Sequence, residues 1–377
     1  MNKTLKYSKF LLVILLISGC RTEKQTGSAT DTTKSGNIEL TKEREMFSII
    51  GVGDIMPGSN YPGAESLPPY DGKYIFDGVR EYLKDADVTC GNLEGTLLDR
   101  GGTPKKCRDS SGNCHSFRIP TRYAGYMADA GFDFLSLANN HSGDMGGEGR
   151  ESTYETLEKF EIEFAGTIEY PTAVMEKDGV KYGFAGFAPN TGTVSILNLD
   201  KAAEIVEDLK KKCDIVIVFF HGGAEGLSAQ RVTGRDEMYL GEKRGNVVEF
   251  SHAVIDAGAD VVFGSGPHVT RAIEKYKGRI IAYSLGNFCT YGKFGLNGQM
   301  GLAPILKVYV NKKGEFLEGE IIPVKQVRRG FPVYDESNAV VNTIINLTEK
   351  DFPETGLEIR EDGRIFLMSN KDVKRES

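Results

Sequence analysis

Residues that can bind a metal ion or a phosphate group follow the short apolar runs of this 377-residue chain. Asp54 comes directly after the first run, and Asn92 and Glu94 follow the second. The corresponding residues after later runs are Asn140, His141, His221, Glu225, His268 and Asn287. Oxygen and imidazole donors of this kind suit Mn, Fe, Zn or Mg ions, and a pair of such ions can activate water and clamp a phosphoryl oxygen. Three of the five histidines lie in this set, so we predict a divalent-metal site.

Several of these residues also fit purely structural roles. Asp54 after a strand could bind turn amides, and Asn140 with His141 could serve a turn and a structural hydrogen bond. We assign structural roles to the two remaining histidines. His115 directly follows Cys114 at the candidate disulfide loop, and His252 lies on an expected helix away from the strand ends.

The elements that must position the site alternate along the chain. Strands are expected at 47–53, 88–90, 134–137, 182–187, 214–220, 260–263 and 280–284. Helices are expected at 74–86, 121–130, 152–160, 200–212 and 245–257, with Ser152 as a cap. Repeated strand–helix–strand units specify an α/β fold with a mainly parallel sheet. Loops after the carboxyl ends of such strands converge on one edge, so these polar residues can meet there.

The last part of the sequence has a different pattern. From about residue 305 it becomes β-rich, with strands expected at 306–310 and 319–324 and a helix-like stretch at 337–347. We therefore expect one main domain over 46–303 and a small C-terminal β-rich extension over 304–377.

The first twenty residues have the pattern of an export signal. Three lysines precede an apolar run at 10–17, which is long enough for a signal-peptide core and too short to span a bilayer. The run ends in Ile-Ser-Gly-Cys, which resembles a lipobox with Cys20 as the lipidated residue; the alternative is a plain secretory signal. We expect a signal peptide at 1–19 and a lipidated, flexible tether at 20–45. This predicts a lipoprotein on the outer side of the cell membrane or on the outer membrane.

Composition and cysteine usage agree with an exported globular protein. A net charge of −7 opposes nucleic-acid binding, which depends on clustered Lys and Arg. Cys107 and Cys114 lie close together in a polar segment and are compatible with a local disulfide. The other three cysteines after Cys20 sit in or beside apolar runs, as buried small hydrophobic residues do.

Six ordered blocks give the sequence a family resemblance. They are GDIMPG at 53–58, GNLEG at 91–95, LANNH at 137–141, HGGAE at 221–225, GSGPH at 264–268 and SLGNF at 284–288. Together they resemble the CapA-type poly-γ-glutamate capsule synthesis family over about residues 47–292. That family is similar to the calcineurin-like metallophosphoesterases. The resemblance therefore implies a four-layer αββα metallophosphoesterase-like sandwich with a site at the strand ends.

The resemblance also implies roles for individual residues. The metal ligands would be Asp54, Glu94, Asn140, His221 and His268, with Glu94 at the position that bridges two metals in phosphoesterases. Asp54 and His141 would be catalytic, His141 as a general acid acting on the leaving group or orienting the phosphate. Additional site positions are Asn92, Glu225 and Asn287, whose roles the blocks do not define.

Two positions depart from the phosphoesterase pattern. Met56 stands where phosphoesterases usually have a histidine, and Gly266 replaces the first histidine of a Gly-His-x-His block. Each metal would lose one ligand, which favours weak binding of a hard metal or a mononuclear site. A vestigial site is the alternative.

The resemblance implies a role in the synthesis, release or surface retention of an anionic capsule or envelope polymer such as poly-γ-glutamate. Membrane proteins of polymer synthesis would be partners. Two alternatives remain open. One is a metal-dependent phosphoesterase, a hydrolase acting on exported phosphate esters, and the other is a non-catalytic scaffold of a polymer-synthesis complex.

Overall fold

The computed structural model describes residues 46–106 and 115–368. The expected signal peptide, the tether with Cys20, and the Cys107–Cys114 pair lie outside these residues. Within the described ranges, no helix is long and apolar enough to cross a membrane.

The first of two large sheets has ten strands and is centred on β1 (Phe47–Met56). The strand order is β19–β20–β17–β16–β1–β2–β5–β6, with β15 also beside β1 and β18 beside β17. β1 is parallel to β2 and β15 but antiparallel to β16. The bounds are β2 Val88–Leu93, β5 Phe134–Ser136, β6 Glu163–Ala165, β15 Asn287–Thr290, β16 Leu302–Val310, β17 Phe316–Val327, β18 Phe331–Tyr334, β19 Leu357–Ile359 and β20 Arg364–Leu367.

The second sheet has six strands in the order β13–β14–β12–β9–β8–β7. Its four central strands are parallel to one another, and the edge strands β13 and β7 are antiparallel to their neighbours. The bounds are β7 Thr172–Lys177, β8 Val180–Phe187, β9 Ile215–His221, β12 Val261–Ser265, β13 Ile273–Tyr276 and β14 Arg279–Ala282. The expectation of one mainly parallel sheet is therefore wrong. The chain forms two mixed sheets, because antiparallel strands are added around each parallel centre.

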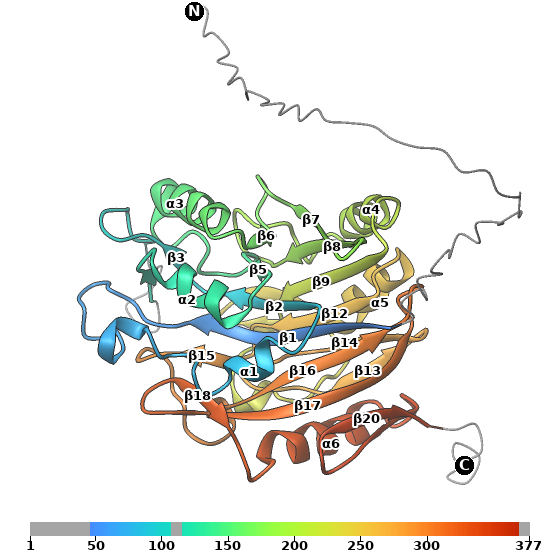
Figure 1. Cartoon of the computed structure of the whole chain (residues 1–377). Helices are drawn as coiled ribbons and strands as arrows, with labels where there is room; N and C mark the ends of the chain where they lie inside the picture. The colour runs from blue at the N-terminus through green and yellow to red at the C-terminus, as the bar shows by residue number, and fades with distance from the viewer. Residues whose placement is uncertain (1–45, 107–114, 369–377) are drawn as a thin grey trace, which may run out of the picture. The chain divides into compact units, whose positions relative to one another are not determined.

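The two sheets pack face to face around a buried core. Phe134 of the first sheet stacks on Phe184 of the second with ring centroids 4.4 Å apart, and Ile49 and Phe263 belong to the same cluster. The outer face of the first sheet is covered by α2 and α3, and that of the second by α4 and α5. These helices span Tyr123–Ala130, Gly146–Lys159, Leu199–Lys210 and Val247–Asp256. The result is the expected four-layer αββα sandwich (Figure 1).

The C-terminal residues complete this sandwich. β16 pairs directly with β1, so the segment expected as an extension supplies strands to the first sheet, and the boundary expected at residue 303 falls inside β16. Helix α6 (Ala339–Asp351) places Val340, Val341 and Ile344 in the core between the sheets. Figure 1 shows α6 alongside β17 and β20.

Two helices differ from the sequence expectation. The segment 74–86 forms turns, and only α1 (Arg80–Leu83) is helical. Gly78 is pressed against the strand region of β18, where an added Cβ would lie 2.8 Å from the Pro332 oxygen. Helix α3 begins at Gly146, so Ser152 lies inside it and does not cap it. The first turn of α3 packs closely, because an added Cβ at Gly149 would lie 2.5 Å from the Met145 Cβ and 3.3 Å from the Thr96 side chain.

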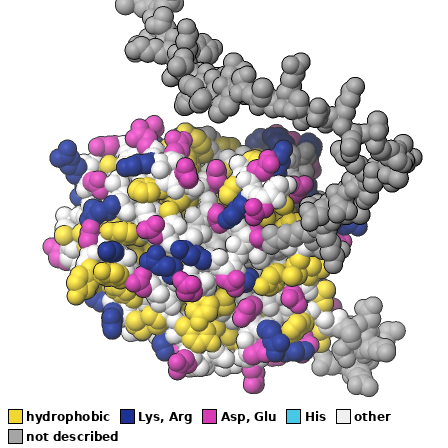
Figure 2. All heavy atoms as spheres, viewed as in Figure 1, with side chains coloured by type: hydrophobic (Ala, Val, Ile, Leu, Met, Phe, Trp, Pro, Cys, Tyr) yellow, Lys and Arg dark blue, Asp and Glu magenta, His cyan; other side chains and the backbone are white. Residues whose placement is uncertain are grey.

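Short elements shape the loops around the strand ends. They are η1 Pro69–Gly72, β3 Thr96–Leu97, β4 Arg118–Ile119, η2 Leu227–Ala229, β10 Glu237–Tyr239, β11 Glu242–Gly245 and η3 Gly298–Gly301. β10 and β11 form a separate two-stranded hairpin. On the face seen in Figure 2, basic and acidic side chains are interspersed with hydrophobic ones.

Candidate metal centre

The predicted site residues come from the facing ends of both sheets. Asp54, in β1, is in register with Asn92 on β2 and Asn287 on β15. β15 can lie this close to β1 because position 53 is glycine, where an added Cβ would lie 1.9 Å from the Gly286 oxygen. The second sheet contributes His221 at the end of β9 and His268 just after β12.

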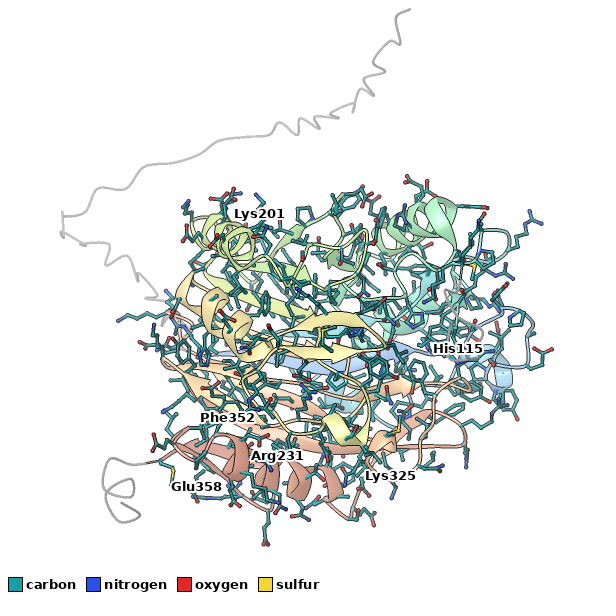
Figure 3. All side chains as sticks on the ribbon, turned by 180° about the vertical axis from the view of Figure 1, so that it is seen from behind. His115, Lys201, Arg231, Lys325, Phe352 and Glu358 are labelled. Carbon is teal, nitrogen blue, oxygen red and sulfur yellow. The ribbon has the colours of Figure 1, made fainter. Side chains whose placement is uncertain are left out.

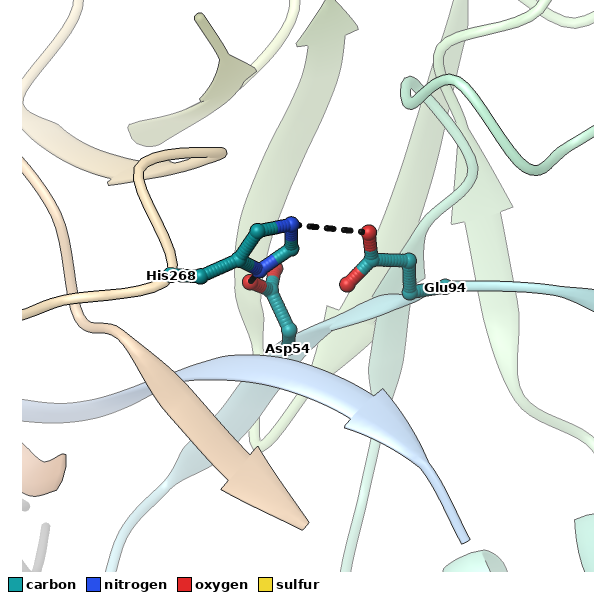
Figure 4. Close-up of side chains that lie close together, drawn as sticks. All are labelled: Asp54, Glu94 and His268. Carbon is teal, nitrogen blue, oxygen red and sulfur yellow. Dashed lines mark hydrogen bonds and ion pairs between the residues drawn. The ribbon is translucent and has the colours of Figure 1, made fainter. Parts of the chain in front are cut away.

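Three buried side chains form the centre of the site (Figure 4). Asp54, Glu94 and His268 each offer one ligand atom, and these atoms lie within 4.8 Å of one another. The His268 Nδ1 atom is 3.0 Å from Asp54 Oδ2, and its Nε2 atom is 3.6 Å from Glu94 Oε1. Two carboxylates and an imidazole at this spacing are a donor set for a divalent cation.

Buried polar atoms without partners surround this centre. Within the described residues, both carboxylate oxygens of Glu94, Oδ1 of Asn140 and Nε2 of His221 have no hydrogen-bond partner. Buried polar atoms in folded proteins are nearly always paired, so such atoms need an explanation. Because all of them are electron-pair donors of the kinds that bind Mn, Mg, Fe or Zn, the residues present fit a divalent metal ion.

Two asparagines orient the central side chains. Asn92 Nδ2 donates to Asp54 Oδ1 at 2.8 Å, and Asn92 Oδ1 accepts from Asn139 Nδ2 at 3.0 Å. Asn287 Oδ1 lies 3.0 Å from His268 Nδ1, and its amide donates to the His268 carbonyl. The structure therefore places Asn92 and Asn287, expected as additional site residues, beside the candidate ligands rather than among them.

His141 belongs to a second polar group at the edge of the centre. Its Nδ1 atom lies 2.7 Å from Asp144 Oδ2, and its Nε2 atom lies 3.8 Å from Glu94 Oε1. Lys105 Nζ is 2.7 Å from the other Asp144 oxygen, and Phe117 stacks on the His141 ring at 4.2 Å. Sequence reasoning missed Asp144 and Lys105. The available signal for Asp144 was its position three residues after His141.

Burial separates the pKa values of the three histidines. Burial lowers the pKa of His141 to about 4, although Asp144 acts in the opposite direction. Burial, followed by the charge of Arg244, also lowers the pKa of His221 well below its usual value. Burial alone would lower the pKa of His268, but Glu94 and Asp54 raise it to about 10. At neutral pH, without a bound cation, His141 is therefore a neutral proton acceptor, whereas His268 is protonated.

The carboxyl group of Glu94 is strongly perturbed as well. Burial, reinforced by the nearby charge of Asp54, raises its pKa well above the usual value. Burial without hydrogen-bond donors disfavours the carboxylate form, whereas the charge of His268 acts in the opposite direction. A bound cation would favour the carboxylate form further.

The two departures from the phosphoesterase pattern have a structural basis. Met56 is buried in the hydrophobic cluster between β1 and α2. Gly266 has a φ of 112°, and an added Cβ would lie 2.9 Å from both the nitrogen and the oxygen of Gly222. Position 266 therefore has no room for a side chain.

A cavity of about 520 Å³ opens in front of the centre. His115 (labelled in Figure 3), to which we assign a structural role from the sequence, lines this cavity. It stacks on Phe117, and this contact brings it to the site. His252 lies outside, because its Nε2 atom pairs with Glu274 at 2.9 Å. The remaining residues around the cavity are Lys105, Lys106, Phe117, Asn140, His141, Asn190, Glu225, Tyr239, Leu240, Gly241, Glu242, Arg244, His268, Lys293, Phe294 and Gly295.

Glu225 joins the centre to a buried arginine. Its Oε2 atom is 3.9 Å from His268 Nε2, and its Oε1 atom accepts a hydrogen bond from Arg244. Arg244 is only 2% exposed and also donates to the Gly223 carbonyl at 3.2 Å. Because the guanidinium holds one carboxylate oxygen, Glu225 faces the centre with the other.

An αββα sandwich with carboxylate, carboxamide and imidazole groups at the facing strand ends defines a metallophosphoesterase-like fold. The chain belongs to the bacterial capsule synthesis protein PGA_cap family, whose model matches residues 48–291.

Two curated relatives carry capsule-related names. The chain is 29% identical to the capsule biosynthesis protein CapA of Bacillus anthracis over 267 residues, which are 66% of this chain and 60% of that protein. It is 28% identical to the PGA biosynthesis protein CapA of Bacillus subtilis (strain 168) over 280 residues, 67% of each chain. The match thus spans less than two thirds of the length of the Bacillus anthracis protein.

Solved structures with a similar arrangement are distant. A hypothetical protein from Thermus thermophilus is 15% identical with a TM-score of 0.45, covering 74% of this chain and all of that one. A 5'-nucleotidase precursor from the same organism is 13% identical with a TM-score of 0.40, covering 81% of this chain and 59% of that one.

Proposed function

We propose that this protein acts in the synthesis, release or surface retention of an anionic capsule or envelope polymer such as poly-γ-glutamate. The action would depend on a divalent metal ion bound by Asp54, Glu94, Asn140, His221 and His268. Support comes from the family and from one observation above all: the buried Glu94 carboxyl group has no hydrogen-bond partner in the described residues and lies between Asp54 and His268. Lipidation at Cys20 would hold the protein at the membrane, close to the membrane proteins that synthesise the polymer.

The proposed chemistry divides between the ion and the protein. A bound Mn, Mg, Fe or Zn ion would polarise an acyl or phosphoryl oxygen and lower the pKa of water. The neutral His141 ring would accept a proton at Nε2, the atom that faces Glu94, while Asp144 holds its Nδ1 proton. This differs from the general-acid role that the family resemblance implied, because the lowered pKa of His141 leaves it without a proton to donate at neutral pH.

His268 has a different proton balance. Its Nδ1 atom is engaged by Asp54 and Asn287, so Nε2 is the atom left for a cation. Because the pKa of His268 is raised to about 10, the ring must lose a proton before Nε2 can bind metal. Metal binding should therefore release protons and weaken as the pH falls.

The function can be tested in a deletion strain by measuring surface polymer after complementation. The wild-type gene should restore the polymer, whereas Glu94→Gln and His221→Asn should not, provided that thermal melting shows folded protein. His252→Asn is the matched control, because this histidine lies outside the centre. Full restoration by Glu94→Gln would show that the centre has no part in polymer production.

A metal-dependent phosphoesterase is the second candidate, and the His141–Asp144 pair beside Glu94 favours it. The test is turnover of aryl phosphate mono- and diesters by purified protein with Mn²⁺. Activity that disappears in Asp54→Ala and His221→Ala would support this function. Absence of turnover by metal-loaded protein would count against it.

A further inference from the structure

Three lysines line the cavity, Lys105, Lys106 and Lys293, and we call them the lysine wall. Lys105 and Lys106 lie at the end of the described range 46–106, and Lys293 follows β15. Residues far apart in the sequence thus bring positive charge to the same cavity.

The lysine wall has more positive charge than the described residues neutralise. Lys105 pairs with Asp144 at 2.7 Å, but neither Lys106 nor Lys293 makes an ion pair with the residues whose positions are described. Lys293 is half-buried, so it is partly removed from water. His115 feels this charge, because its pKa is lowered first by burial and then by Lys293 and Lys105. Lys106 is exposed. Unpaired ammonium groups gathered around one cavity create a positive potential that attracts an anion.

The arginine that lines the cavity does not offer a comparable group. The guanidinium of Arg244 already binds Glu225 and lies 3.7 Å from Glu242. An anion entering the cavity would therefore meet free positive charge at Lys106 and Lys293 rather than at Arg244.

Two phenylalanines that line the cavity, Phe117 and Phe294, contact the metal centre, and we call them the aromatic floor. Phe117 and Phe294 lie with ring centroids 5.4 Å apart. Phe117 stacks on His141 at 4.2 Å, and Phe294 meets His268 edge-on at 5.2 Å. A short aliphatic segment can pack on such rings, while polar groups at its two ends reach the lysines and the centre.

We propose that the lysine wall is a subsite for the carboxylate of an acidic polymer. The aromatic floor holds the methylene groups between that carboxylate and the carbonyl presented to the centre. A γ-linked glutamyl unit has this arrangement, because its free carboxylate is separated from its amide carbonyl by methylenes. This inference rests on the proposed function and specifies the group that is recognised.

Binding of a γ-linked glutamate oligomer to the full-length protein in detergent tests the subsite by calorimetry. Lys293→Gln and Lys106→Gln should each weaken binding about fivefold, as expected for a partly exposed ion pair. Lys293→Arg should retain binding because it keeps the charge. Lys313→Gln is the control, since this exposed lysine lies in the turn between β16 and β17. Affinity should fall as salt is raised.

Two further ligands distinguish recognition of a carboxylate from recognition of a phosphate. The oligomer with methyl-esterified carboxylates should not bind, and inorganic phosphate should compete only weakly. Unchanged affinity in both glutamine variants, or equal binding of the ester, would overturn the subsite. Inorganic phosphate that binds more tightly than the oligomer, with the same dependence on Lys293, would show a phosphate site and refute the carboxylate assignment.

The subsite and the proposed function can fail separately. If the glutamine variants bind normally but Glu94→Gln does not restore polymer, the subsite is wrong and the function stands. If Glu94→Gln restores polymer, the proposed function is wrong, whatever the oligomer does.

Discussion

The buried, neutral state of His141 should appear in the pH dependence of stability. Folding lowers the pKa of this histidine from 6.5 to about 4, so the folded protein binds fewer protons between these values. The stability that comes from keeping the ring neutral is fully present above pH 6.5 and is lost as the pH falls through 6.5 toward 4. A shift of this size corresponds to roughly 3 kcal/mol.

The perturbation is His141→Asn, compared with wild type in the presence of a chelator. The free energy of unfolding would be measured by urea denaturation, followed by circular dichroism, at pH 7, 6, 5 and 4. The wild-type advantage over the variant should shrink by roughly 3 kcal/mol between pH 7 and pH 4, because only wild type must protonate a buried imidazole.

His141→Gln provides the matched control. Its stability at pH 7 can differ from that of His141→Asn, because the two amides reach different atoms. The difference in unfolding free energy from wild type must nevertheless change with pH by the same amount for both variants, because that change comes from the imidazole that both variants lack. Wild-type and variant stabilities that run parallel from pH 7 to pH 4 would refute the reasoning.

Three further measurements test the site. Gly266→Ala should lower the free energy of unfolding by about 2–4 kcal/mol, because of its positive φ and the contact with Gly222. Gly179→Ala, where φ is also positive but nothing lies within 4 Å, should lower it by only about 1 kcal/mol. Equal losses would contradict the packing explanation. In wild type, Mn²⁺ should raise the melting temperature, and Glu94→Gln should remove this rise; an unchanged rise would place the metal elsewhere. Glu225→Ala should cost about 3 kcal/mol in urea denaturation because it leaves Arg244 buried without its partner, and a negligible cost would show that Arg244 is otherwise satisfied.

The central part of the site was predictable because strand ends are predictable. Asp54, Glu94 and His268 each follow a buried apolar run, and strand ends of packed sheets converge on one cluster. Asp54 and His268 are 214 residues apart in the sequence, yet their side chains are in contact. Their separation in sequence is no obstacle, because topology brings them together.

The residues that support the site were harder to predict. Asp144 and Lys105 act through contacts between loops, and local periodicity carries no information about such contacts. The same limit explains why the mixed strand pairing of the sheets was not predicted. The antiparallel pairing of β16 with β1 joins strands about 260 residues apart, which no local pattern encodes. Segment 74–79 has a helical spacing of apolar residues, yet it forms turns that pack against β18.

The contact between Gly266 and Gly222 also has an evolutionary consequence. A histidine at position 266 would place its Cβ against the backbone of Gly222, so the loop around residue 222 would have to move before the ring could fit. Mutations arise one codon at a time, so a chain carrying this pair of glycines could acquire a histidine at 266 only through a destabilised intermediate. An imidazole is therefore hard to introduce at this position.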